Sequence, residues 1–470
     1  MQNQQTHYMK LFPSQTYINR RNTLKEAVGS GLILFQGNDE ASMNYADNHY
    51  RFRQDSTFLY YFGINQAGLN AVIDCDSGEE IIFGDEFSID DIIWIGQQET
   101  LSSKAEKVGI LNVRPANGID SFLEIARDKK IHYLPAYRAD NLNKLSQWLH
   151  LPGSKVNQEV SQKLLMAIIN QRSYKSEEEI EQMTEAVNIS GQMHINAMKA
   201  VKPGRYEFVA VSEIYRTAKA SNSYLAYPAI FSINGQILHN HYHGNKMQSG
   251  RLVLNDSGAE NEMCYSGDIT RTIPVDGKFT TRQKDIYDIV LEMETSSIDS
   301  LKPGLLYKDI HVNANRLMLS KLKELGLVKG DIEEMTNLGV GGIFMPHGLG
   351  HMIGMDVHDM ENFGEQLVGY REGLERSTQL GLKSLRLGRE LEKDFVITVE
   401  PGLYFIPDLI EKWKADKIFT DFINYDILKE YYDFGGIRIE DNILITENGS
   451  QILGKPIPKT TEEVEETMAL

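Results

Sequence analysis

Five polar residues, four carboxylates and one imidazole, lie in five short and distinctive sequence words within one half of the chain. The words are NDSG, SGDITRT, PHGLGH, TVEPG and IRIED, and the residues are Asp256, Asp268, His351, Glu400 and Glu440. Taken singly, each has an ordinary interpretation as a turn residue, a cap or a surface ion pair. A fold that brings the four carboxylates together has to offset their mutual repulsion in a medium of low dielectric constant.

The word GIRIED shows how local geometry selects the side chains that point toward such a cluster. Side chains alternate between the two faces of a strand. Ile437 and Ile439 therefore point toward a core, and Arg438 and Glu440 point together to the opposite face. Glu400 follows three β-branched or apolar residues and precedes Pro-Gly, which predicts a buried strand end. A buried carboxylate needs a cation or hydrogen-bond donors.

Two divalent cations would neutralise four carboxylates, and one imidazole would complete the ligand set. A shell of oxygen atoms with one nitrogen and no thiolate suits Mn(II), and also Co(II), Fe(II) or Zn(II). Two metal ions in such a site activate water at neutral pH and polarise a carbonyl group. The constellation therefore predicts hydrolysis of an amide or a similar bond.

Composition narrows the class of protein further. A chain of 470 residues predicts two domains. The formal net charge of -18 disfavours binding to nucleic acid or to an anionic membrane surface. No apolar run is long enough to span a bilayer, and the N-terminal MQNQQTHYMKLF lacks the apolar stretch of a signal peptide. With only Cys75 and Cys264, the chain has no disulfide framework, so we expect a cytoplasmic protein.

The first domain is expected to span residues 1–172 and to be of the α/β type. Strands are expected at 71–75, 79–85, 89–96 and 130–135, with a turn at 76–78 and a helix at 162–173.

The second domain is expected to span residues 173–470. Ser176 and Glu179 fit a capping box that begins a helix, and Thr460 and Glu463 fit another near the end. Strands are expected within 251–260, 395–405 and 435–446, which are rich in β-branched residues.

These words carry a resemblance to a known family. NDSGAE, GDITRTIPV, MPHGLGHMIGMDVHD, VEPGLYF and GGIRIED resemble the pita-bread (M24) metallopeptidases, in their aminopeptidase P and prolidase branch. DSTFLYYFGI and DDIIWIG are similar to the non-catalytic N-terminal domain of that branch. The resemblance implies an α/β (α+β) architecture in which an N-terminal α/β domain precedes a pita-bread, creatinase/aminopeptidase-like catalytic domain. It also implies a homo-oligomer, a dimer or higher.

The resemblance implies a role for each of the five residues. Asp256 would bind one metal ion, and Asp268 and Glu440 would bridge the two ions. His351 and Glu400 would bind the second ion. Glu400 would also help to move a proton from the attacking water to the leaving nitrogen.

Four neighbouring residues match the branch's substrate-side groups. His239 in NGQILH, His347 in PHGLGH and His358 in DVHD would lie at the substrate carbonyl and the leaving group. Arg438 would anchor the site beside its bridging glutamate. These matches extend a metal site to a peptidase site.

The sequence departs from the family pattern at two places, of which one is the long stretch between His358 and Glu400. The two aspartate ligands are 12 positions apart, one more than is usual, and we place the extra residue in the turn around 261–263. His241 and His243 follow His239 so closely that either could take its place, although we expect them to have loop or surface roles.

The branch cleaves the bond between an N-terminal residue and proline, a tertiary amide without an N–H. A peptide with proline at the second position is therefore the expected substrate, and an Xaa-Pro aminopeptidase is the expected activity. A dipeptide also carries a carboxylate directly after proline. Segment 381–391, GLKSLRLGREL, resembles a prolidase insert in which Arg386 would bind that carboxylate as a bidentate fork. An Xaa-Pro dipeptidase is thus an open alternative, and a plain surface-helix charge is the alternative interpretation of Arg386.

Two other classes remain. A metal-free pita-bread protein, either an amidinohydrolase or a peptide-binding module, would lose some or all of the five ligands, and here all five types are present. A metal-dependent hydrolase of a non-peptide ester, such as an organophosphate, is the other.

Overall fold

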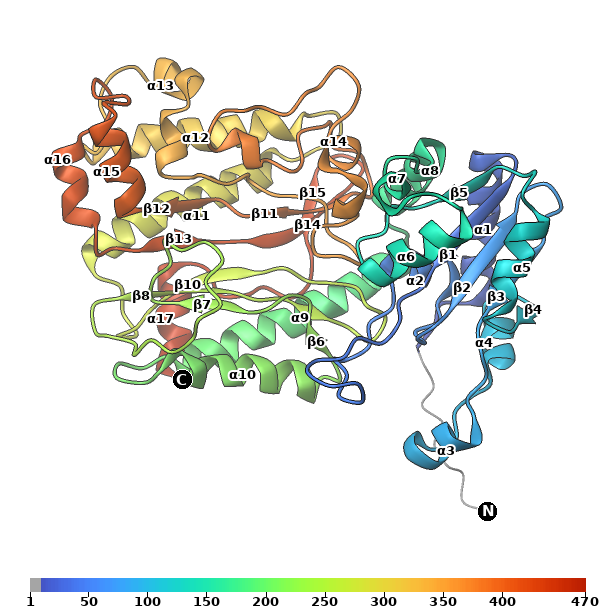
Figure 1. Ribbon diagram of the computed structural model, residues 1–470. Helices are drawn as coiled ribbons and strands as arrows, with labels where there is room; N and C mark the ends of the chain where they lie inside the picture. The colour runs from blue at the N-terminus through green and yellow to red at the C-terminus, as the bar shows by residue number, and fades with distance from the viewer. Residues whose placement is uncertain (1–9) are drawn as a thin grey trace. The chain divides into compact units, whose positions relative to one another are not determined.

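The computed structural model describes residues 10–470 (Figure 1). The chain divides into two compact units, Met1–Arg172 and Ser173–Leu470. Most of the N-terminal segment MQNQQTHYMKLF, for which the sequence predicts no signal peptide, lies outside the described residues. Among the described helices, none combines the length and the apolar character needed to cross a membrane.

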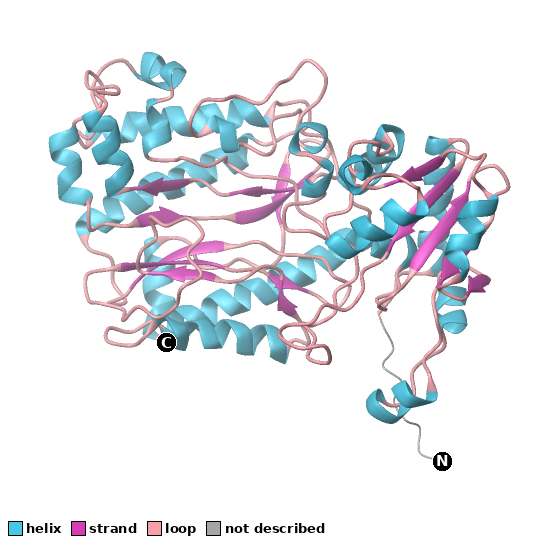
Figure 2. Cartoon of the chain, viewed as in Figure 1, coloured by secondary structure: helices cyan, strands magenta, loops and turns pink. Residues whose placement is uncertain are grey.

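The first unit is built on a five-stranded sheet of order β4-β3-β2-β1-β5 (Figure 2). Its strands are β1 (Leu32–Gln36), β2 (Asn70–Asp74), β3 (Glu80–Phe83), β4 (Asn112–Arg114) and β5 (Ile131–Tyr133). The pairs β1–β2 and β2–β3 are antiparallel, whereas β1–β5 and β3–β4 are parallel. The expected turn between β2 and β3 is present, with Gly78 at a φ of +81° that suits glycine.

Eight described helices of the first unit precede, separate or follow the strands of this sheet in the sequence. They are α1 (Ser14–Val28), α2 (Ser56–Phe62), α3 (Ile89–Ile95), α4 (Leu101–Lys107), α5 (Gly118–Ile125), α6 (Ala139–Trp148), α7 (Gly153–Val156) and α8 (Gln162–Ser173). Helix α8 has the bounds that the sequence predicts.

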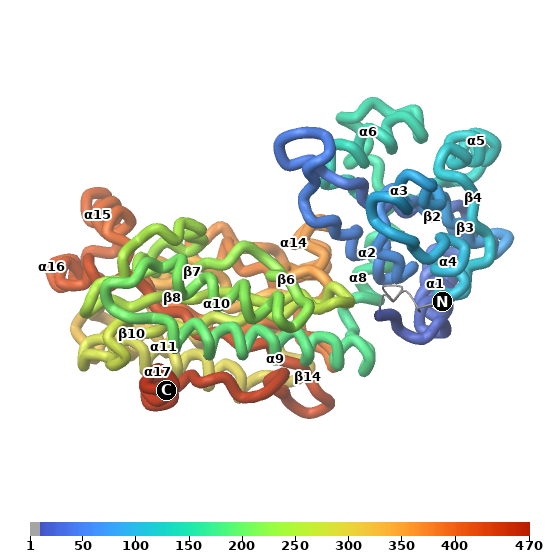
Figure 3. Tube along the Cα trace, turned by 90° about the horizontal axis from the view of Figure 1, so that it is seen from below, coloured from blue at the N-terminus to red at the C-terminus, as the bar shows by residue number. Residues whose placement is uncertain are grey.

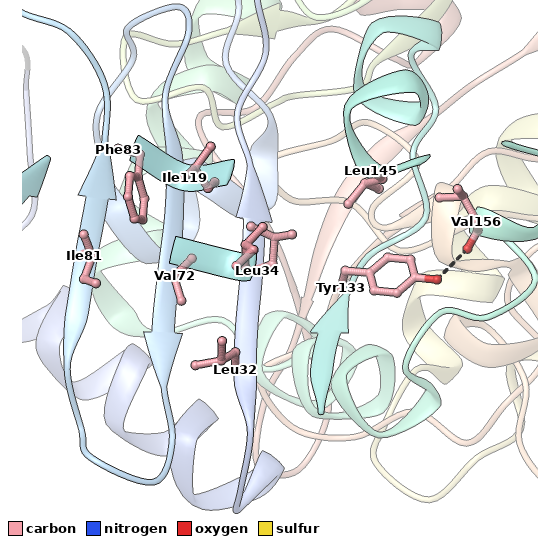
Figure 4. Close-up of a cluster of buried hydrophobic side chains, with 10 residues drawn as sticks. Leu32, Leu34, Val72, Ile81, Phe83, Ile119, Tyr133, Leu145 and Val156 are labelled. Carbon is pink, nitrogen blue, oxygen red and sulfur yellow. Dashed lines mark hydrogen bonds between the residues drawn. The ribbon is translucent and has the colours of Figure 1, made fainter. Parts of the chain in front are cut away.

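A core of apolar side chains fixes helices α5, α6 and α7 to the sheet. Leu34 of β1, Val72 of β2 and Phe83 of β3 pack with Ile119 of α5 and Leu145 of α6 (Figure 4). Full burial of side chains of this size contributes about 1.5–3 kcal/mol each. The tyrosine hydroxyl that β5 contributes to this cluster donates a 2.9 Å hydrogen bond to the backbone carbonyl of the last residue of α7, so that burial leaves it satisfied.

The prediction of a strand at 89–96 is wrong, because Ile89–Ile95 form helix α3. Ser88 caps it: its Oγ accepts from Asp91 N at 3.1 Å, and its own N–H donates to Asp91 Oδ2 at 2.8 Å. No residue of α3 is buried, and Trp94 is 85% exposed. Short apolar runs cannot be assigned by periodicity alone, and here a capping box with acidic residues in the first turn favours the helix.

Two pairs of long helices enclose the strands of the second unit. Helices α9 (Glu177–Ala200) and α10 (Glu207–Ala220) run side by side (Figure 1, Figure 3), and α11 (Thr281–Ser300) and α12 (Tyr307–Glu324) lie on the other side of the strands. The expected capping box of α9 is present, with Ser176 N donating to Glu179 Oε2 at 3.1 Å and the reciprocal bond at 3.3 Å.

The strands between these helices form small antiparallel sheets. One has the order β10-β8-β7 and another the order β11-β14-β15, while β12 pairs with β13 and β6 with β9. The strands are β6 (Tyr224–Leu225), β7 (Ile230–Ser232), β8 (Leu252–Asp256), β9 (Ala259–Glu260), β10 (Thr270–Pro274), β11 (Val396–Val399), β12 (Gly402–Tyr404), β13 (Gly436–Arg438), β14 (Asp441–Ile445) and β15 (Ser450–Ile452).

Short helices complete the second unit. They are α13 (Ile332–Leu338), η1 (Val340–Ile343), η2 (Glu361–Phe363), α14 (Glu365–Val368), η3 (Leu382–Ser384), α15 (Pro407–Ala415), α16 (Tyr425–Leu428), η4 (Lys429–Tyr431) and α17 (Thr461–Ala469). The predicted capping box of Thr460 and Glu463 begins α17. A turn lies at 261–263, where Asn261 Oδ1 accepts from Met263 N and Tyr265 N.

Candidate metal centre

Two buried aspartates come from one antiparallel pair of strands. Asp256 ends β8 and lies opposite Thr270 of β10, and Asp268 lies two residues before that threonine. The hydroxyl of Tyr227 lies 2.6 Å from Asp256 Oδ1 and 2.5 Å from Asp268 Oδ1. A hydroxyl has one proton, so it can serve only one of these oxygens at a time. The two carboxylates are thus held close together with one donor between them.

The main chain of Asp268 is clamped from a distant strand. Asn442 of β14 accepts from Asp268 N at 2.9 Å and donates from Nδ2 to Asp268 O at 2.7 Å. Both atoms of the amide are therefore used to place one aspartate. Such an arrangement orients the carboxylate without touching it.

Glu440 and Arg438 point to the same face, as the alternation along the strand predicts, and both contact Thr270. Thr270 Oγ1 donates to Glu440 Oε2 at 2.7 Å and accepts from Arg438 Nε at 3.2 Å. Arg438 also donates to Asp256 Oδ2 at 2.5 Å and to the hydroxyl of Tyr404 at 2.6 Å. The second oxygen of Glu440, Oε1, is buried and has no hydrogen-bond partner. A buried acceptor without a partner costs free energy, and a bound metal ion would remove that cost. Glu440 Oε1 is therefore a candidate metal-ligand atom.

His351 and Glu400 approach from the loop after η1 and from the end of β11. His351 Nε2 lies 3.4 Å from Asp268 Oδ2 and 3.7 Å from Glu400 Oε1. Its Nδ1 lies 3.0 Å from Met352 O, which orients the ring. The segment is a loop, as the glycines predict. At Gly350 a Cβ would stand 2.1 Å from Thr398 O, so only glycine allows this loop to reach β11.

The ligand atoms of Asp268, His351 and Glu440 all lie within 4.8 Å of one another. Asp256 joins this trio through Tyr227, and Glu400 joins it through His351. The five residues of the sequence prediction are therefore brought together in one cluster, in which Glu400 is partly buried and the other four are buried.

The carboxylates of this cluster carry an excess of negative charge that bound cations would neutralise. Burial, reinforced by Asp268 and Glu400, raises the pKa of Glu440 well above its usual range. Burial also raises the pKa of Glu400 to about 7 and the pKa of Asp256, the latter against the lowering effect of Arg438. One guanidinium and one imidazole do not compensate three buried carboxylates and the partly buried carboxylate of Glu400. Divalent cations fit this donor set of oxygens with one nitrogen.

His347 is held neutral beside the cluster. Its Nδ1 lies 2.7 Å from Gly348 O, and its Nε2 lies 2.9 Å from the hydroxyl of Tyr404. Because the carbonyl of Gly348 can only accept, the ring proton is on Nδ1, and the hydroxyl of Tyr404 donates to Nε2. Burial and the charge of Arg438 lower the pKa of His347 to about 3.

His358 and His239 flank the cluster. The ring centroids of His358 and His351 are 4.4 Å apart, and His358 Nδ1 lies 2.7 Å from Glu361 Oε2. His239 lies within electrostatic reach of Arg438 and Asp256.

Two other histidines of the same loop contact only the backbone in the described structure. His243 Nε2 lies 3.0 Å from Ala229 O, and His241 Nδ1 lies 3.5 Å from the same atom. These are the loop roles that the sequence predicts for them.

Arg386 lies in a bend after η3 and not on a helix. Its Nη1 donates to Glu361 Oε1 at 2.7 Å and also contacts Glu365 Oε1. Arg386 is therefore linked to His358 through Glu361.

Sequence reasoning missed four residues that hold the cluster: Tyr227, Thr270, Tyr404 and Asn442. Thr270 and Tyr404 stand inside the words GDIT and VEPGLYF, where a hydroxyl next to a ligand is a usable signal. Asn442 and Tyr227 offer no such signal, because nothing local distinguishes them from other strand or loop residues.

Comparisons with known proteins agree with this site. Residues 181–447 match the model of metallopeptidase family M24, and residues 17–133 match that of the aminopeptidase P N-terminal domain. The chain is 34% identical over 460 residues to the Xaa-Pro dipeptidase of Rattus norvegicus, which covers 96% of this chain and 91% of the rat protein. It is 33% identical over 442 residues to a probable Xaa-Pro aminopeptidase of Verticillium alfalfae, which covers 93% and 92% of the two chains.

A solved structure is similar along the whole chain. Zn-substituted aminopeptidase P of Escherichia coli in complex with product has a TM-score of 0.81 and 30% identity, over 98% of this chain and 99% of that chain. The matches define the class of the protein, a two-domain metal-dependent hydrolase. The chain belongs to metallopeptidase family M24. The predicted fold class, an N-terminal α/β domain followed by a pita-bread domain, is confirmed, and family membership implies divalent metal ions.

Proposed function

We propose that this chain is a metal-dependent exopeptidase that hydrolyses the bond between an N-terminal residue and proline, an Xaa-Pro aminopeptidase. The observation that carries the proposal is the closeness of Asp268, His351 and Glu440, whose ligand atoms lie within 4.8 Å of one another, together with the buried and unpartnered oxygen Glu440 Oε1. Relatives named Xaa-Pro aminopeptidase and Xaa-Pro dipeptidase support the choice of bond.

Asp256, Asp268, His351, Glu400 and Glu440 would hold two divalent cations. The donor set favours Mn(II), with Co(II), Fe(II) and Zn(II) as the other candidates. When bound, the cations supply an activated water at neutral pH and polarise the scissile carbonyl. Asp268 and Glu440 both belong to the trio whose ligand atoms lie within 4.8 Å of one another, and each would offer an oxygen to the cations.

The remaining side chains bind and orient the peptide. Glu400 takes a proton from the attacking water and returns it to the proline nitrogen, which has no hydrogen of its own and leaves only when protonated. His239 and His358 hydrogen-bond the substrate around the scissile bond, and His347, whose ring nitrogens contact Gly348 O and the Tyr404 hydroxyl, orients that hydroxyl beside them. Arg438 keeps Asp256 and the hydroxyl next to His347 in place, at 2.5 Å and 2.6 Å.

An Xaa-Pro dipeptidase is the second candidate, because Arg386 offers a cation to a carboxylate after proline. The rat relative is a dipeptidase. A metal-free amidinohydrolase or peptide-binding module is disfavoured, since all five ligand types are retained.

The test compares Ala-Pro, Ala-Pro-Ala and Ala-Ala with Mn(II)-loaded protein. Cleavage of the tripeptide at the Ala-Pro bond supports the aminopeptidase, and cleavage of the dipeptide alone supports the dipeptidase. Equal cleavage of Ala-Ala would refute proline specificity. Asp268→Ala serves as the inactive reference, and a wild-type rate from it would refute the metal site.

We further propose that residues 173–470 form the catalytic domain and residues 1–172 the non-catalytic domain of a cytoplasmic homo-oligomer. Light scattering after size exclusion measures the oligomeric state, and a monomer at working concentration would contradict it.

A further inference from the structure

Glu361, three residues after His358, holds two different partners with its two oxygens. Oε2 lies 2.7 Å from His358 Nδ1, and Oε1 accepts from Arg386 Nη1 at 2.7 Å. The side chains of Glu361 and Arg386 are 45% and 30% exposed, so that a solute can reach the pair. One carboxylate thus couples a histidine at the metal cluster to the cation proposed for the substrate's C-terminus.

A second carboxylate completes the environment of Arg386. Glu365, at the start of α14, contacts the same Nη1 and binds Arg376 Nη2 at 2.5 Å. Two carboxylates therefore face Arg386, and only Glu361 also contacts His358. The guanidinium is already neutralised by the chain itself.

We propose that Glu361 determines specificity: its carboxylate occupies Arg386 and thereby disfavours substrates with a free carboxylate directly after proline, relative to substrates that carry a neutral amide there. This inference rests on the proposed function, and it concerns substrate choice within that function.

The physical reason is an exchange of ion pairs. A dipeptide carboxylate that binds Arg386 has to displace Glu361 or share the guanidinium with it, and either arrangement brings two negative charges together. A neutral amide at the same place leaves the 2.7 Å pair intact. Because the pair is partly exposed, its loss or gain is expected to change affinity by about threefold to fivefold.

Glutamine at position 361 separates the charge from the contact with His358. Its side-chain oxygen still accepts from His358 Nδ1–H, so the imidazole keeps its orientation and tautomer. Alanine removes both the charge and the acceptor. The two substitutions therefore isolate the electrostatic part of the proposal.

The experiment measures kcat and KM for Ala-Pro and for Ala-Pro-NH2, which have the same length and differ in the terminal charge. For Glu361→Gln we expect the ratio of kcat/KM for Ala-Pro to kcat/KM for Ala-Pro-NH2 to rise about threefold to fivefold. Glu361→Ala should in addition lower kcat for both substrates. Glu365→Gln should lower KM for Ala-Pro without touching His358.

Glu390→Gln is the matched control, since Glu390 pairs with Arg371 at 2.9 Å and not with Arg386. Combining Glu361→Gln with Arg386→Ala should abolish the gain. Equal changes for the two substrates, or a gain that survives the loss of Arg386, would overturn the inference while wild-type activity upholds the proposed function. A wild-type protein that cleaves neither substrate would refute the proposed function itself.

Discussion

Glu440→Gln should make the metal-free protein more stable and the metal-loaded protein inactive. Glu440 is 1% exposed, and its Oε1 has no partner, while its Oε2 accepts from Thr270 at 2.7 Å. Glutamine keeps an acceptor for Thr270 and places a neutral donor among carboxylates. Because a buried atom without a partner costs about 1–3 kcal/mol, we expect the free energy of unfolding in EDTA to rise by about that amount.

Mn(II) should stabilise the wild type more than it stabilises the Glu440→Gln variant. A ligand at 100 times its dissociation constant stabilises the folded state by about 2.7 kcal/mol. The wild type should gain about this amount in Mn(II), and the variant should gain much less, because it lacks one anionic ligand.

Urea unfolding at pH 8, in EDTA and in Mn(II), measures both effects, with Ala-Pro hydrolysis measured in parallel. Glu390→Gln, at a partly exposed ion pair on the surface, should leave both unfolding curves unchanged. A Glu440→Gln protein that is less stable than wild type in EDTA, or that gains as much from Mn(II), would refute the assignment of Glu440 as a metal ligand.

Three further predictions follow from single contacts. Tyr404→Phe removes the hydroxyl between Arg438 and His347, so kcat should fall at least about tenfold with little change in KM, while circular dichroism stays unchanged. Asn442→Ala frees the main chain of Asp268, which we propose as a metal ligand, so Mn(II) affinity, measured by calorimetry, should fall about 10–100-fold. Burial lowers the pKa of His194 to about 4, so the unfolded chain takes up the proton first as pH falls from about 6.5 to 4. Over this pH range the free energy of unfolding of the wild type, measured by urea titration at each pH, should fall by about 3 kcal/mol more than that of His194→Gln.

Features that depend on a few neighbouring residues followed from the sequence. The capping boxes that begin α9 and α17 and the turn at Gly78 rest on contacts within three or four positions. The common face of Arg438 and Glu440 rests on the period of a strand. Where the local signal was ambiguous, as at Trp94 and its apolar neighbours, the predicted strand was wrong, because that run has both β-branched residues and a helix cap.

The sequence by itself determined the family, the chemical types of the five cluster residues and the order of their words, because these are written in short motifs. Only the tertiary structure decided which oxygen of Glu440 stays without a partner, that Tyr227 stands between two aspartates, and that Glu361 holds Arg386. Those outcomes depend on atoms that long-range packing brings together: Thr270 and Glu440 are joined across 170 positions and Glu361 and Arg386 across 25. Periodicity assigns a side chain to a face, but the choice of partner is made by distances that only the folded chain defines.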